Sequence, residues 1–146
     1  MNAIITIKSN QLYDDNNETI ELVTEGTFEP LGDGFRITYE ESEMTEMEGV
    51  TTSILVEPSK IVVDRTGGVH YQMVFEKGNR NMCHYDTGYG TFLLSICTDT
   101  IENAITPDGG SLNIEYSLEV DNAQVSDNIF YIEVKAAGLL APGLAN

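Results

Sequence analysis

Basic side chains are scarce in this chain. It has 7 Lys and Arg residues against 24 Asp and Glu residues, and its formal net charge is -17 at pH 7. A surface with this charge repels phosphate backbones and anionic lipid head groups. The composition therefore argues against nucleic acid and membrane surfaces as partners. Solubility is the simplest role for the acidic surface, and recognition of a basic partner is the alternative.

Cysteine is almost as rare. Cys83 and Cys97 are the two cysteines, they form no C-x-x-C pair, and two are too few for a disulfide scaffold. We expect free thiols, with Cys97 as a small buried side chain in the apolar run 91–98 and Cys83 in a more polar setting. A Cys83–Cys97 disulfide is the alternative.

Long apolar runs and an export signal are also missing. Residues 1–8 contain no basic segment followed by a long apolar one. No run approaches the roughly 20 apolar residues that a membrane helix needs. We therefore expect a cytoplasmic protein with no membrane partner.

Few residues suit metal or catalytic chemistry. His84 and Asp86 are the best candidates for metal ligands, because alternate residues of a strand share a face. A partly exposed strand histidine is the simpler interpretation, so we predict no metal and no cofactor. No nucleophile elbow or phosphate-binding loop is present, and we predict no catalytic residue. We interpret the acidic stretch 40–48 as a solvated connection.

Short segments with alternating apolar residues make up most of the chain. The pattern is clear in residues 19–28, 35–40, 71–76 and 112–120, and clusters of Gly, Pro, Asn and Asp separate the segments. It predicts a single all-β domain of eight to ten antiparallel strands over 1–135, followed by an apolar, loosely ordered tail at 136–146.

An open sheet of this size leaves two exposed edges, so we expect it to close into a β-barrel. A two-sheet sandwich is the alternative. Residues 42–47 and 99–105 could each hold a short helical turn.

Arg65 is the most suggestive polar residue. It follows an apolar run, and strand alternation places it on the same face as Ile61 and Val63. If that face points inward, the guanidinium needs polar partners. Those partners could be Glu40 or Glu41, the hydroxyls of Tyr39 and Tyr85, or the carboxylate of a bound ligand. A structural salt bridge is the simpler interpretation.

Several short motifs occur together in an order that resembles a known family. They are Y-E-E at 39–41, R-x-G at 65–67, F-x-x-G at 75–78 and Y-x-T-x-x-G at 85–90. The chain resembles the YwiB-like family of small bacterial proteins over residues 4–135. The resemblance implies a calycin-like, up-and-down barrel of about eight strands and no established activity. The chain has no Trp, so the G-x-W signature of lipocalins is absent.

Three classes of function are compatible with these observations. The first is a barrel that binds a small apolar or amphipathic anionic ligand, since a barrel of about eight strands can hold one such molecule. Its expected site residues are Arg65, Tyr39, Glu41, Tyr71, Met73, Phe75 and Tyr85. The second is a filled barrel that acts as a protein-interaction or structural module, for example as a homodimer. We place an enzyme last.

Overall fold

The computed structural model describes residues 1–13, 16–41, 49–67, 70–86, 91–120 and 123–136. These residues form ten strands and no helix long and apolar enough to cross a membrane. The strands are β1 (Asn2–Tyr13), β2 (Asn16–Leu31), β3 (Gly34–Glu40), β4 (Thr51–Val56), β5 (Ile61–Thr66), β6 (Tyr71–Phe75), β7 (Arg80–Asp86), β8 (Thr91–Thr106), β9 (Gly109–Val120) and β10 (Ala123–Ala136).

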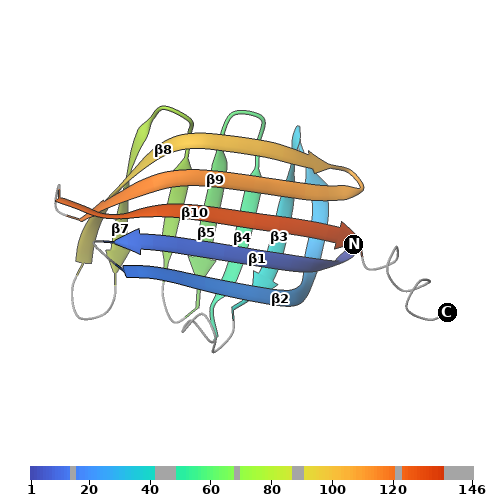
Figure 1. The fold of residues 1–146 in the computed structure, drawn as a ribbon. Coiled ribbons are helices and arrows are strands. Elements are labelled where there is room, and N and C mark those ends of the chain that lie inside the picture. The colour runs from blue at the N-terminus through green and yellow to red at the C-terminus, as the bar shows by residue number, and fades with distance from the viewer. Residues whose placement is uncertain (14–15, 42–48, 68–69, 87–90, 121–122, 137–146) are drawn as a thin grey trace.

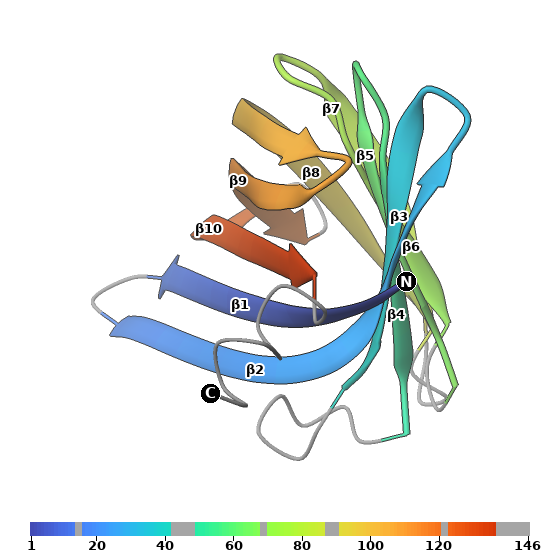
Figure 2. The same ribbon diagram turned by 90° about the vertical axis from the view of Figure 1, so that its right-hand side faces the viewer.

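All ten strands belong to one antiparallel sheet with the order β6-β5-β4-β3-β2-β1-β10-β9-β8-β7. Each strand pairs with its neighbour in sequence, and the first and last strands pair with each other. The exception is β6 and β7, which form the two ends of the sheet but still contact each other. The sheet curls so that β8, β9, β10 and β1 face β3, β4 and β5 (Figures 1 and 2). The predicted all-β barrel is confirmed in a nearly closed form.

Alternation along the strands separates an inner face from an outer one. In β4, Thr52, Ile54 and Val56 are buried while the residues between them are partly exposed. The core contains a large set of fully buried aliphatic and aromatic side chains, among them Phe28, Ile5, Ile37, Ile61, Ile96, Leu112, Ile114 and Ile132. Each such side chain contributes about 1.5–3 kcal/mol through removal of apolar surface from water.

Gly26 lies at a corner of the barrel. β2 pairs with β1 as far as residue 27 and with β3 from residue 26, so Gly26 faces both Ala3 and Tyr39. A Cβ at this position would clash with the carbonyl oxygen of Thr38 and with Ile5. The absence of a side chain therefore lets three strands approach closely where the sheet bends.

The expected helical turn at 99–105 is wrong. β8 continues through this segment to Thr106 and pairs with β9 along its length, with a register shift between Thr98 and Thr100. The turn at Pro107 and Asp108 joins the two strands as a hairpin, and the long ladder outweighs any local helical preference. Residues 42–47, where a second helical turn was expected, lie outside the described residues, as do residues 137–146 of the tail.

The two cysteines are free thiols, but their environments differ from the expected ones. Cys83 is buried in the core, and Cys97 is only partly buried on the outer face. The Sγ atom of Cys97 lies 3.5 Å from Oε2 of Glu119. The apolar run 91–98 has apolar residues on both faces, so alternation alone does not show which one points inward.

Candidate functional site

Side chains fill one part of the barrel, and the other part holds a cavity of about 350 Å³. The cavity lies at the end of the barrel where β1, β3 and β5 end and β2 and β6 begin. Below it, buried aliphatic residues close the interior. The cavity therefore occupies one end of the barrel interior.

A row of directly paired residues forms one side of the site, in which Tyr39, Arg65 and Tyr71 line the cavity and Thr52 is fully buried between them. Tyr39 of β3 pairs with Thr52 of β4, Thr52 pairs with Arg65 of β5, and Arg65 pairs with Tyr71 of β6. Paired residues on one face of a sheet have their Cβ atoms roughly 5 Å apart, which brings their side chains into contact. The strand register therefore assembles four polar side chains into a continuous inward-facing group.

Arg65 is the centre of this group. Its Nη1 atom donates a hydrogen bond of 2.6 Å to the Tyr71 hydroxyl, and its Nε atom donates one of 3.3 Å to Oγ1 of Thr52. The Thr52 hydroxyl in turn donates a bond of 2.7 Å to Oε1 of Glu41. The Glu41 carboxylate lies 3.7 Å from Nε of Arg65, so the two charges form an ion pair that Thr52 bridges.

Burial and charge determine how these groups ionise. Burial raises the pKa of the Tyr39 hydroxyl above its ordinary value, although the positive charge of Arg65 opposes this rise. Burial also raises the pKa of Tyr116, to about 12. For Arg65, burial lowers the pKa, but Tyr71, Tyr39 and Glu41 outweigh it and the pKa lies above its ordinary value. At neutral pH the site thus presents a charged guanidinium beside neutral phenols.

The opposite wall is mainly apolar. Ile7 of β1 pairs with Leu22 of β2, and together with Ile20 and Phe130 they line the cavity. Polar residues follow towards the end of the barrel. Ser9 pairs with Ile20, and Gln11 pairs with the exposed Glu18. All three polar side chains, Ser9, Gln11 and Glu18, line the cavity. The cavity therefore has a polar wall, an apolar wall and an acidic group at its mouth.

Four of the expected site residues lie together in this cavity: Arg65, Tyr39, Glu41 and Tyr71. Met73 and Phe75 follow Tyr71 on the inward face of β6, but they are buried in the core and do not line the cavity. The side chain of Tyr85 lies outside what the structure describes. Glu40, considered as a partner of Arg65, is exposed on the other face of β3.

Several residues of the site were not expected from the sequence. Tyr116 belongs to the alternating segment 112–120, whose apolar positions predicted its inward direction. For Thr52, nothing in the sequence indicated a role in the site other than its position in a predicted strand. Other lining residues come from β1 and β10. They reach the cavity because the first and last strands, which are far apart in sequence, pair with each other. No local pattern indicates that pairing.

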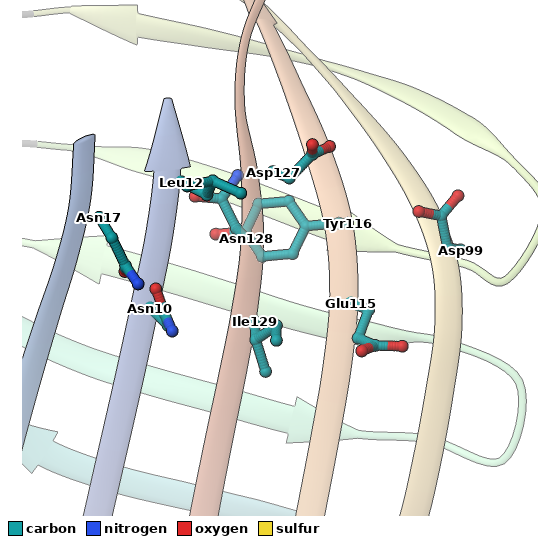
Figure 3. Close-up of a pocket in the computed structure, with 9 residues that line it drawn as sticks. All are labelled: Asn10, Leu12, Asn17, Asp99, Glu115, Tyr116, Asp127, Asn128 and Ile129. Atoms are coloured by element: carbon teal, nitrogen blue, oxygen red, sulfur yellow. The ribbon is translucent and has the colours of Figure 1, made fainter. Parts of the chain in front are cut away.

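A second hollow, of about 330 Å³, is lined by residues of β1, β2, β8, β9 and β10, including Tyr116, which also lines the barrel cavity (Figure 3). The carboxylates of Asp99, Glu115 and Asp127 line it, and Glu115 accepts a hydrogen bond of 2.8 Å from Thr100. Among the described residues, no three His, Cys, Asp or Glu side chains lie close enough together to hold a metal ion. This hollow gives no geometric reason to assign it a ligand.

Comparison with known proteins gives consistent results. A family model described as "Domain of unknown function (DUF1934)" matches residues 5–132. The chain is 25% identical to the "Uncharacterized beta-barrel protein YwiB" of Bacillus subtilis (strain 168) over 111 residues, which cover 76% of this chain and 77% of that protein.

The crystal structure of the ywiB protein from Bacillus subtilis has a similar fold. Its TM-score to this chain is 0.84 at 22% identity, with 93% of this chain and 92% of that chain covered. The family match spans most of the barrel, from β1 into β10. The chain therefore belongs to the family of β-barrel proteins that carry this domain of unknown function.

Proposed function

We propose that the protein binds a small amphipathic molecule in the barrel cavity, with an anionic group of the ligand on Arg65. The observation that carries this proposal is a charged guanidinium at the wall of a cavity. Arg65 donates hydrogen bonds to Thr52 through Nε and to Tyr71 through Nη1, and Tyr39 and Glu41 also interact with it. A guanidinium has five N–H donors in a planar fork that matches a carboxylate. Arg65 therefore has the geometry to hold an anionic group.

The shape of the cavity supports a ligand with an apolar part. Ile7, Ile20, Leu22 and Phe130 lie across the cavity from the polar row. Binding would remove this apolar surface from water, which favours association. A volume of about 350 Å³ has room for about a dozen water molecules, so the ligand has a similar number of non-hydrogen atoms. This volume is at the lower end of the range for ligand pockets.

Native mass spectrometry of the purified full chain tests the proposal. We expect an additional mass in the native spectrum that disappears under denaturing conditions. The variant Arg65→Met should lose this mass, because it removes the donor fork and keeps a similar apolar volume. The control Arg36→Met removes a positive charge on the outer face, where Arg36 pairs with Glu29 at 3.4 Å, and should retain the mass.

The result that would overturn the proposal is a ligand that Arg65→Met retains in full. A bare dimer without added mass would favour an interaction module instead. Circular dichroism of each variant shows whether it folds. If Arg65→Met does not fold, Arg65→Lys keeps the charge, loses the fork and should bind the ligand less tightly.

A further inference from the structure

The charges that line the cavity do not suit a simple anion. Arg65 contributes one positive charge, while Glu41 and Glu18 contribute two negative ones. Glu41 lies 3.7 Å from Arg65 and already neutralises it. The formal charges of these described lining side chains, one positive and two negative, sum to -1. A ligand with a carboxylate and nothing else would add a third negative charge to this small space.

We infer that the ligand is a small zwitterion with an apolar side group, which bears an ammonium group beside its carboxylate in the manner of a hydrophobic α-amino acid. This inference rests on the proposed function and specifies its ligand. The carboxylate lies on the Arg65 fork, and the ammonium group faces the Glu41 and Glu18 side of the cavity. The ligand then compensates the excess charge instead of increasing it.

The dimensions of the polar wall support this class of ligand. The amine and carboxylate of an α-amino acid are attached to the same carbon atom, so their charges are only a few ångströms apart. Arg65 and Glu41 present opposite charges at a comparable separation of 3.7 Å. The side group of the ligand lies against Ile20, Leu22 and Phe130 on the opposite wall. Each part of the ligand thus meets a wall of matching chemistry.

The charge of the whole protein favours the same conclusion. At a formal net charge of -17, the protein repels free anions on approach and does not repel a molecule of zero net charge. Glu18 is exposed at the mouth of the cavity and would oppose the entry of an anion further. Both the entry route and the cavity therefore disfavour an uncompensated carboxylate.

Matched small molecules test the inference by isothermal titration at neutral pH. L-phenylalanine is compared with 3-phenylpropanoate, which lacks the ammonium group, and with 2-phenylethylamine, which lacks the carboxylate. L-leucine and 4-methylpentanoate form a second pair. We expect at least one amino acid to bind 10-fold or more tightly than its deaminated partner. The variant Glu18→Gln should reduce this ratio several-fold, and Glu25→Gln, which removes an exposed charge on the outer face of β2, should not change it.

The outcomes separate this inference from the proposed function. If the anions bind as tightly as the amino acids, or 2-phenylethylamine binds more tightly than L-phenylalanine, the zwitterion inference is overturned. If no compound binds, the accurate mass of the co-purified ligand decides: a composition without nitrogen overturns the inference and leaves the proposed function intact. If no compound binds and no co-purified mass exists, both fail.

Discussion

Arg65 and Glu41 form an ion pair inside the barrel, 3.7 Å apart, and the hydroxyl of Thr52 accepts from one and donates to the other. The Glu41 side chain is 2% exposed and the Arg65 side chain 14%. Charges this well removed from water are costly to leave alone, whereas the intact pair is close to neutral in its net effect on stability. Loss of either residue is therefore expected to destabilise the fold as well as to alter the site.

The first prediction concerns this coupling. Arg65→Met and Glu41→Gln should each lower the free energy of unfolding by about 3 kcal/mol, because each leaves one charged or polar partner buried without its counterpart. The double variant should lose much less than the sum of the two. Urea denaturation of the four proteins gives the coupling energy directly. Strictly additive losses would show that the two residues do not interact in the folded protein.

The second prediction concerns alkaline pH. Tyr116 ionises near pH 10 in the unfolded chain, whereas burial raises its pKa to about 12 in the folded protein. Between these two pH values the unfolded state has released a proton that the folded state retains. The contribution of Tyr116 to the free energy of unfolding is therefore complete below about pH 10 and is lost as the pH rises towards its folded pKa. Burial raises the pKa of Tyr39 too, which acts in the same direction.

Each such tyrosine contributes a slope of up to about 1.4 kcal/mol per pH unit. The free energy of unfolding, measured by urea denaturation between about pH 9 and about pH 11.5, should fall less steeply in Tyr116→Phe than in the wild type. Tyr131→Phe gives the contribution of a tyrosine on the outer face: burial and the neighbouring Glu133 carboxylate raise the pKa of Tyr131 as well, so this variant should also make the fall less steep. An unchanged slope in Tyr116→Phe would mean that this hydroxyl is accessible to solvent in the folded state.

Much of the polar row was predictable because strand alternation is a local property. The inward directions of Arg65 and Tyr39 follow from the apolar residues two and four positions before each, and that of Tyr71 follows from the apolar residues two and four positions after it. That the three meet depends on the register of the four consecutive strands β3 to β6. Neighbouring strands in sequence usually pair, so this register is also close to local information.

The hollow part of the barrel was not predictable on the same grounds. Whether Met73 and Phe75 line a cavity or fill a core depends on the total volume of the inward side chains from all ten strands. Phe130 reaches the site because β10 pairs with β1, more than one hundred residues away in sequence. The closure of the barrel and the volume of its interior depend on the whole assembled sheet, so neither can be predicted from a single segment of the sequence.

The third prediction concerns the corner at Gly26. Gly26→Ala should lower the free energy of unfolding by at least about 2 kcal/mol, because its methyl group would meet the backbone of Thr38 and the side chain of Ile5. The control is Gly32→Ala in the turn between β2 and β3, where a Cβ meets no atom within 4 Å and the cost comes from a φ of 60° alone. That cost is about 1 kcal/mol. A smaller loss at Gly26 than at Gly32 would show that the corner can relax.

The fourth prediction separates the two cysteines. Burial raises the pKa of both thiols, and the carboxylate of Glu119 adds to the effect at Cys97. The thiolate is the reactive form, so an aromatic disulfide reagent should react slowly with the native protein. Cys97 should react first because it is partly exposed on the outer face, whereas Cys83 is 3% exposed in the core.

Titration should give one reactive thiol in the native protein and two after denaturation, and Cys97→Ser should abolish the native reaction. A native reaction that survives Cys97→Ser would mean that the contact between β6 and β7 opens often enough to expose Cys83, because these two strands are not joined by ladder hydrogen bonds.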